Sequence, residues 1–342
     1  IGDHAFANCA GLVDVTFMGA APEIAAAAFS GDTVHCHTPA YDSSWDSKIH
    51  KNYGGNLTWD IGSGTCGNSV NWVLNYDREL VISGSGAMYN YSYDSSPWKS
   101  LREQIHSVIV CDGVTSIGDY AFYGCSKLSS VTIADSVTTI GRGKYYNTGG
   151  SFSNCTSLTE ITIPRNVTNV AYFTFVGCDN LTTIKVADGN TSYTGVDGIL
   201  YDRYKRILYC YPSGKTGAFT IPSTVKEIAC SAFAYNEGLT EGTIPSNVTS
   251  IGYAAFEGCS SLKTVEFGDS ITAIGNDAFK NCYKLQSITI PDTVNYVGHR
   301  AFYGCSGLTN VVFSTSVVFI GEGVVSQCSS LKTVTFLGDA PH

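Results

Sequence analysis

The stretch that decides the fold is residues 251–262, IGYAAFEGCSSL. The same pattern returns as IGNDAFKNCYKL over 274–285 and as VGHRAFYGCSGL over 297–308, each time 23 residues further on. A fixed period of this length is typical of a protein built from stacked repeats, in which each unit buries its apolar side only against its neighbours. The period predicts an architecture, but by itself it does not indicate any catalytic activity.

Each repeat follows the pattern I-G-x-x-A-F-x-x-C-x-x-L-x-x-V-x-I-x-x-x-V-x-x. The L-x-x-V-x-I part alternates as a short strand does, and V-x-x-I-G is a second extended piece that ends at a glycine turn. A-F-x-x-C predicts one turn of α- or 3₁₀-helix. We therefore expect an α/β repeat solenoid with helical or 3₁₀ turns. In it, Phe279 is expected to be buried between Phe256 and Phe302, and Lys280 to contribute little to stability.

Most of the cysteines are in phase with the repeat. In one motif this position holds Asn236, which indicates an inward-facing turn where a small side chain meets backbone groups. Stacked coils bring such positions within disulfide reach, but the side chains of a ladder point in parallel, so we predict free, buried thiols. Eight of the thirteen cysteines occupy the position: Cys9, Cys125, Cys155, Cys178, Cys259, Cys282, Cys305 and Cys328.

The motif VTSIGDYAFYGCSKLSSVTI over 114–133 resembles the repeat of BspA-like leucine-rich repeat proteins, which are found mostly on the surfaces of gut and oral bacteria. The resemblance covers about three quarters of the chain. It implies a leucine-rich-repeat solenoid and a cell-surface or secreted protein that takes part in adhesion.

Breaks in the period divide the chain. Residues 1–62 are expected to be the C-terminal end and cap of one array, and 63–113 a Gly/Ser linker followed by a β-rich N-terminal cap. A second array is expected over 114–342, with a loop insertion at 142–150 and a hairpin insertion at 193–215. Because the chain starts inside a repeat, we interpret it as part of a longer protein whose signal and anchor lie elsewhere.

The charge balance bears on the partners. The net charge is −9, and a nucleic acid or an anionic membrane would require a basic patch. No apolar run approaches the ~20 residues that span a bilayer. We expect neither nucleic-acid binding nor membrane insertion within this chain, and an extracellular or cell-surface location.

The chain shows no known catalytic motif. A nucleophile elbow, a zinc-protease helix motif and a phosphate-binding loop are all missing from the sequence, so we expect no enzyme activity and no cofactor. The array thiols should be inert because they are buried. Cys230 replaces a solvent-facing position, and it is the thiol that we would test for reactivity.

Two stretches hold potential metal ligands. His35 and His37 lie two residues apart, but no third ligand is near them in sequence, and Cys36 should point the other way. Asp188, Asn190 and Asp197 lack the spacing of a calcium loop and are interpreted as turn residues. No metal is expected.

Tyrosines gather where the repeat is interrupted, and tyrosine is enriched in binding interfaces. The alternative is that these rings pack the cap and seal the hairpin. A row of threonines on the strand face is a further candidate surface, although a β-branched residue also simply suits a half-exposed strand. The candidate ligand-binding residues are Tyr89, Tyr91, Tyr93, Tyr145, Tyr146, Tyr201 and Tyr204.

The leading hypothesis is a non-enzymatic surface or secreted module that binds a protein or a glycan of a host or microbe. Alternatives are a spacer that projects other domains and an accessory region of a carbohydrate-active protein. The first rests partly on the family resemblance, and a fold by itself does not specify a function.

Overall fold

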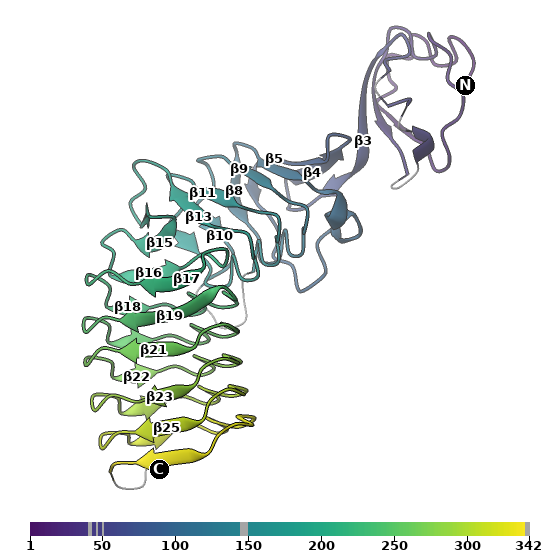
Figure 1. Cartoon of the computed structure of the whole chain (residues 1–342). Coiled ribbons are helices and arrows are strands. Elements are labelled where there is room, and N and C mark those ends of the chain that lie inside the picture. The colour runs from purple at the N-terminus through teal and green to yellow at the C-terminus, as the bar shows by residue number, and fades with distance from the viewer. Residues whose placement is uncertain (40–42, 46, 50, 144–149, 339–342) are drawn as a thin grey trace.

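The computed structural model describes residues 1–39, 43–45, 47–49, 51–143 and 150–338. The chain winds into a stack of coils that runs from the N-terminal unit to the C-terminus and bends part-way along, near β15–β17 (Figure 1). Tyr145, Tyr146 and most of the expected 142–150 insertion lie outside the described residues.

Two sheets form the first part of the stack. Coils pair parallel and in register, as in Val108↔Val131, whereas β3–β4 and β4–β5 pair antiparallel. The first sheet has the order β1(Asp14–Thr16), β2(Thr33–His37), β3(Asn56–Thr65), β4(Val70–Asn75), β5(Glu79–Gly84), β7(Ser107–Val110), β9(Ser130–Ile133). The second has the order β12(Asn169–Val170), β10(Thr139–Ile140), β8(Val114–Ile117), β6(Gly86–Ala87).

Four sheets continue the stack. A small one pairs β11(Glu160–Ile163) with β13(Thr183–Val186). The longest has the order β14(Tyr193–Val196), β15(Ile199–Asp202), β16(Ile207–Cys210), β18(Glu227–Ile228), β20(Ser250–Ile251), β22(Ala273–Ile274), β24(Tyr296–Val297), β26(Phe319–Ile320). The others contain β17(Gly217–Thr220), β19(Leu239–Ile244), β21(Thr264–Phe267) and β23(Ser287–Thr289), β25(Asn310–Phe313), β27(Thr333–Phe336).

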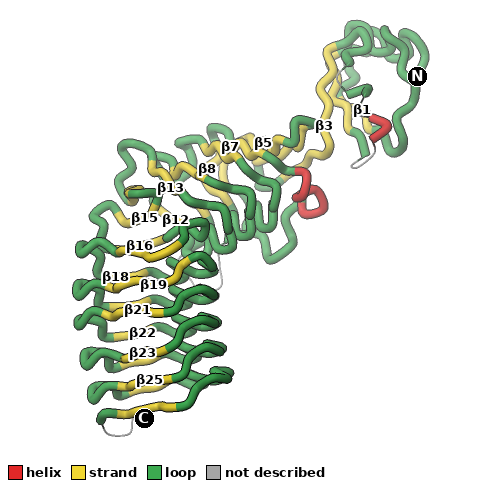
Figure 2. Tube along the Cα trace, in the orientation of Figure 1, coloured by secondary structure: helices red, strands yellow, loops and turns green. Residues whose placement is uncertain are grey.

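The expected helical turns are wrong. The described residues hold only two helices, both short 3₁₀ segments outside the A-F-x-x-C motif, η1(Ser43–Trp45) and η2(Lys99–Gln104) (Figure 2). Neither could cross a membrane. The fold is therefore a β-solenoid of stacked short strands, of leucine-rich-repeat type, rather than an α/β solenoid.

The backbone of the turn explains why it does not form a helix. Ala254 and Gly258 both have positive φ angles, of 52° and 72°, which a right-handed helix excludes. The N–H groups of Ala254, Phe256 and Gly258 donate to carbonyls of the next coil at 2.7–2.9 Å. Those of Ala255, Glu257 and Cys259 bond within the turn. Every second amide thus ties one coil to the next, which strengthens the stacking at the expense of helical bonds.

The predicted aromatic ladder is confirmed. Phe256, Phe279 and Phe302 are fully buried, and their rings stack at centroid distances of 4.9 and 5.5 Å. Two further rings, Phe233 and Tyr211, continue the ladder at 4.5 and 4.8 Å.

The cysteine ladder is confirmed as well. All thirteen cysteines are free. The Cys282 thiol donates to the Phe256 carbonyl at 3.2 Å, and Cys259 and Cys305 bond in the same way to the coil before them. Asn236 makes the equivalent bond to the Pro212 carbonyl at 3.0 Å. Among the in-phase thiols only the outermost, Cys9 and Cys328, are not buried.

The Gly/Ser stretch that was expected to be a linker forms part of a strand. Residues 62–65 belong to β3 and pair with 71–74 of β4, so one continuous strand joins the N-terminal unit to the array (Figure 1). Glycine is required here for packing. A Cβ atom on Gly64 would lie 2.9 Å from Nε1 of Trp72, and one on Gly62 would lie 3.2 Å from the same ring. The indole ring of Trp72 packs directly against this Gly-rich segment.

Segment 193–215 interrupts the core. Its strands β14, β15 and β16 pair antiparallel, whereas β16 pairs parallel with β18 of the next coil. Leu200 and Tyr209 pack into the apolar core that precedes the insertion, whereas Tyr201 and Leu208 pack into the one that follows. A third, smaller core lies in the N-terminal unit around Phe29. The two large cores meet at the insertion, where the stack bends in Figure 1.

Candidate functional site

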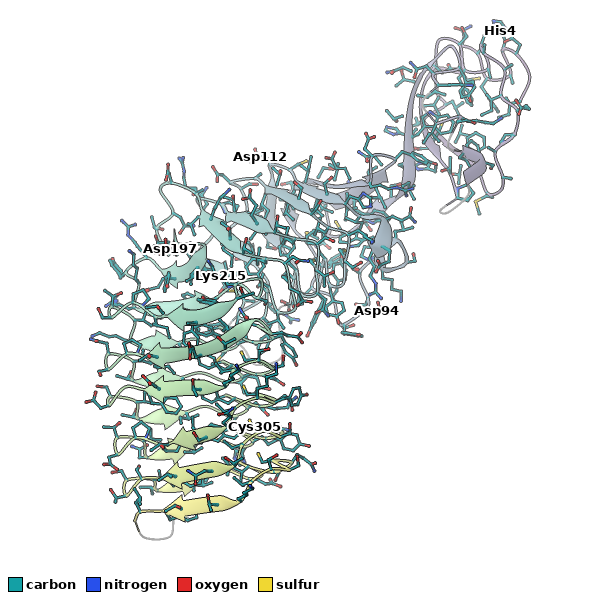
Figure 3. All side chains as sticks on the ribbon, in the orientation of Figure 1. His4, Asp94, Asp112, Asp197, Lys215 and Cys305 are labelled. Carbon is teal, nitrogen blue, oxygen red and sulfur yellow. The ribbon has the colours of Figure 1, made fainter. Side chains whose placement is uncertain are left out.

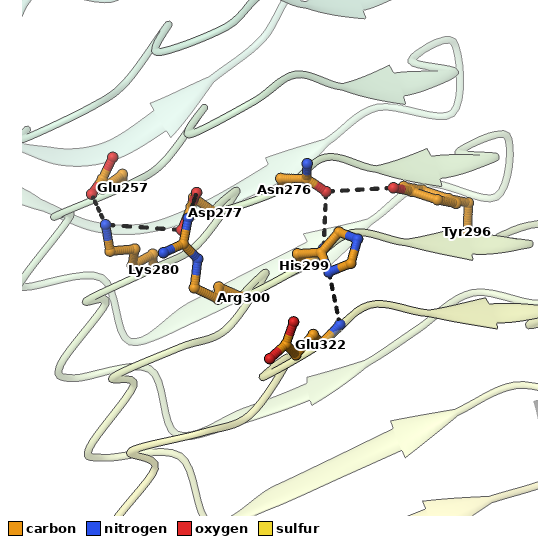
Figure 4. A network of polar contacts seen from close by, with 8 residues as sticks. All are labelled: Glu257, Asn276, Asp277, Lys280, Tyr296, His299, Arg300 and Glu322. Carbon is orange, nitrogen blue, oxygen red and sulfur yellow. Dashed lines mark hydrogen bonds and ion pairs between the residues drawn. The ribbon is translucent and has the colours of Figure 1, made fainter. Parts of the chain in front are cut away.

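The A-F-x-x-C turns form a ridge along one side of the stack. Cys305 marks this side in Figure 3, and Asp197 of the inserted segment lies on the opposite side. Ion pairs link successive turns (Figure 4): Lys280 Nζ lies 2.7 Å from Glu257 and 3.8 Å from Asp277, and Arg300 lies 3.1 Å from Asp277. Lys280 is therefore part of a half-buried network, which the expectation of a small contribution to stability did not take into account.

The insertion leaves a gap in this ridge. Tyr211 donates its N–H to the Ala232 carbonyl at 2.7 Å, and its ring stacks on Phe233, so Tyr211 and Pro212 stand where a full turn would otherwise lie. The turns on either side of the gap then meet. Ser231 Oγ donates to the Tyr172 carbonyl at 2.8 Å, although the two residues are 59 positions apart.

A cleft of about 520 Å³ occupies this gap. Turns from both sides of the insertion line it, and most of the apolar lining is aromatic. The rings come from Tyr120, Tyr123, Phe173, Tyr235 and Tyr253, and the carboxylates come from Asp179 and Glu237.

The rings support one another at the walls. Tyr123 packs on Tyr120 and on Tyr93 at centroid distances of 5.9 and 4.8 Å. Phe173, from one side of the insertion, meets Tyr253 from the other side edge-on at 6.2 Å. Burial raises the pKa of Tyr123 and Tyr253, so both hydroxyls stay protonated at neutral pH. The walls are therefore neutral and aromatic.

The entrance of the cleft carries two negatively charged side chains. Asp179 and Glu237 are both exposed. Burial, and then the negative charge of Glu237, raises the pKa of Asp179, which places the two acids within electrostatic reach of each other. No lysine, arginine or histidine is found among the described lining residues.

Of the sequence-predicted tyrosines in the described part of the chain, the structure brings only Tyr93 to this cleft, through its contact with Tyr123. Tyr89 is exposed, and its hydroxyl donates to Asn68 at 2.9 Å. Tyr91 is half-buried against Trp98. Tyr204 is 66% exposed on the hairpin, with the Arg206 guanidinium over its ring.

Tyr201 requires a correction. Its side chain is only 1% exposed and belongs to the core that follows the insertion, so it is not available to a ligand. The place of β15 between the two cores explains the difference, because Leu200 faces the core that precedes the insertion and Tyr201 faces the one that follows it.

The lining residues that sequence reasoning missed occupy the variable x positions of I-G-x-x-A-F-x-x-C. Tyr120 and Phe173 take the second x, Tyr253 the first, Tyr123 the third and Tyr235 the fourth. An aromatic residue at an x position on the turns that flank an insertion is the signal that could have found them.

Cys230 also requires a correction. It is half-buried, and burial raises the pKa of its thiol. A reactive cysteine needs the opposite shift, because the thiolate is the nucleophile. The structure gives no basis for enhanced reactivity.

Three of the potential metal ligands, His35, His37 and Asn190, bond to other protein groups. His37 lies 2.8 Å from Asp60 and 3.3 Å from Asp14, and His35 lies 2.7 Å from the Thr58 hydroxyl. Asn190 is buried; its side chain donates to the carbonyl of Pro164 in the preceding coil and accepts from the N–H of Tyr193 in its own turn. No group of three or more candidate ligands gathers within the part of the chain that the structure describes.

Comparison with known proteins assigns the repeat. Six copies of the BspA type leucine rich repeat region match residues 1–41, 100–151, 148–196 and 226–340. The chain belongs to the BspA-type leucine-rich repeat family. This BspA-type assignment confirms the resemblance seen in the sequence. No curated protein matches the chain.

Solved structures show the same fold. The chain is 24% identical to a leucine rich cell surface protein of Faecalibacterium prausnitzii A2-165, with a TM-score of 0.63 over 82% of this chain and 96% of that one. It is 20% identical to the pneumococcal vaccine antigen PcpA, with a TM-score of 0.66 over 91% of this chain and 69% of that one. The BspA-type assignment and the solved structures thus agree on a leucine-rich-repeat fold.

Proposed function

We propose that this BspA-type chain is a non-enzymatic recognition module of a bacterial surface or secreted protein, and that it binds a macromolecule at the cleft. The observation that carries the proposal is the 520 Å³ aromatic cleft at the gap in the ridge. Ligand sites are typically concave, largely apolar and furnished with a few polar groups. The spacer alternative gives no reason for such a cleft.

Several features favour recognition over catalysis. Burial raises the pKa of the ladder thiols, such as Cys125 to about 12, which disfavours the reactive thiolate. The ridge is tied together by amides that cross from coil to coil, so the cleft walls rest on a rigid scaffold. Rigid aromatic side chains give contact area at a low cost in conformational entropy.

The surface location is part of the proposal. It is supported by the family and by the F. prausnitzii relative, which is described as a cell surface protein.

Binding of the whole chain to immobilised extracellular-matrix proteins and to a glycan array tests the proposal. For any ligand found, Tyr235→Ala should weaken binding by roughly fivefold or more, because Tyr235 is an aromatic wall of the cleft. Tyr204→Ala is the matched control, since both tyrosines are exposed and only Tyr235 lines the cleft. Equal effects of the two variants, or no ligand on either array, would favour the spacer.

A further inference from the structure

Two exposed carboxylates lie at the cleft, and no basic residue is found among the described residues that line it. Asp179 and Glu237 are exposed at its mouth, and the negative charge of Glu237 adds to burial in raising the pKa of Asp179. Elsewhere on the ridge the pattern differs, because Glu257 and Asp277 have Lys280 and Arg300 as partners. The two cleft carboxylates have no such partner among the described lining residues.

The rest of the lining favours a cation as well. Two side-chain donors at the cleft are already engaged: Ser153 Oγ donates to the Phe173 carbonyl at 2.7 Å, and Asn154 Nδ2 donates to the Tyr123 hydroxyl at 2.9 Å. The faces of tyrosine and phenylalanine rings attract cations, most strongly where water is excluded.

We propose that the cleft binds a protonated lysine or arginine side chain that a protein partner inserts between the tyrosines, with its charge held by Asp179 and Glu237. The inference rests on the proposed function and names its partner as a protein with a protruding basic side chain. The volume of about 520 Å³ is sufficient for one such side chain and the backbone that carries it.

The test uses the whole chain and two pairs of probes that differ only in charge. Ac-Gly-Arg-Gly-amide is compared with its citrulline analogue, and Ac-Gly-Lys-Gly-amide with its norleucine analogue. Binding is followed in 0.15 M NaCl by the NMR shifts of the backbone amides of Ser153 and Gly177. The salt screens long-range attraction to the acidic surface. The charged peptide of each pair is expected to bind at least about tenfold more tightly.

Two double variants that remove the same amount of charge distinguish the effect of the cleft carboxylates from the effect of the overall charge of the protein. Asp179→Asn with Glu237→Gln should weaken binding of the arginine peptide roughly tenfold. Asp269→Asn with Asp292→Asn removes the same charge at exposed acids outside the cleft lining, and it should change affinity less than about twofold.

The outcomes that overturn the proposal are distinct. Equal binding of the arginine and citrulline peptides, or equal losses in the two double variants, rules out a cation site. Shifts of the same amides with cellotriose but not with the basic peptides would assign the cleft to carbohydrate. In that case the cation proposal would be wrong, but the proposed recognition function would not be contradicted. The macromolecule arrays with Tyr235→Ala test that function separately.

Discussion

The ring of Phe279 stacks on the ring of Phe256 with 4.9 Å between centroids and only 3° between their planes. Because the rings stack nearly parallel over successive coils, each ring is covered on both faces by its neighbours. The loss of one ring therefore opens a cavity that neither neighbour can fill. Phe279→Ala should lower the free energy of unfolding by about 3–5 kcal/mol. Urea denaturation followed by circular dichroism measures the loss. Lys284→Ala, at an exposed position of the same coil, is the control and should be nearly neutral.

Lys280 deserves a separate measurement, because it holds two acids of the ridge at once. Lys280→Ala would leave the buried Asp277 and Glu257 with less compensation, and we expect a loss of about 1–2 kcal/mol in unfolding free energy. A second variant, Lys280→Ala with Glu257→Gln, should recover part of the loss by removing one of the uncompensated charges. A loss no larger than that of Lys284→Ala would show that the ion pairs are fully screened by water.

The cysteine ladder makes stability sensitive to alkaline pH. Burial is the main cause that raises the pKa of Cys282 above its ordinary value of 9.0. Below pH 9 the thiol is protonated in both the folded and the unfolded chain, so its contribution to the free energy of unfolding is fully present. Above pH 9 the unfolded chain loses the proton first, and stability falls until the folded thiol titrates as well.

For one thiol this loss amounts to at most about 1.4 kcal/mol between pH 8 and pH 10. Urea unfolding in the presence of a reductant measures it. Cys282→Ala should show a pH dependence that is shallower by that amount, while the other thiols and the buried tyrosines contribute equally to both proteins. Identical slopes for the two proteins would contradict the burial of this thiol.

The two hairpin tyrosines should differ in how much they contribute to the free energy of unfolding. Tyr201 is buried, so Tyr201→Ala should cost about 3 kcal/mol or more. Tyr204 is exposed and stacks only against Arg206, so Tyr204→Ala should change the unfolding free energy by less than about 0.5 kcal/mol. Thermal melts of both variants test the assignment, and similar losses would mean that the hairpin packs differently.

Much of the fold could be predicted from repeat phase alone. The burial of Phe279, the free thiol of Cys282 and the equivalence of Asn236 with cysteine all follow from one position recurring in register. The turn conformation could not be predicted in this way, because A-F-x-x-C is as compatible with a helical turn as with one that alternates its hydrogen bonds. That choice depends on carbonyls in the next coil. The β3 strand was missed for a similar reason, since Gly62 and Gly64 indicate a linker until Trp72 is placed against them.

The sequence by itself determined the family, the period and the direction of every side chain that repeats, because a stacked coil presents the same position to the same neighbour each time. Only the tertiary structure decided where a ligand could enter. The cleft brings Tyr120 and Tyr123 close to Tyr235 and Tyr253 across an insertion of three strands. Its residues occupy positions that the repeat leaves free to vary, and their distance depends on how the insertion replaces one turn of the ridge. The period of the chain carries no information about that gap.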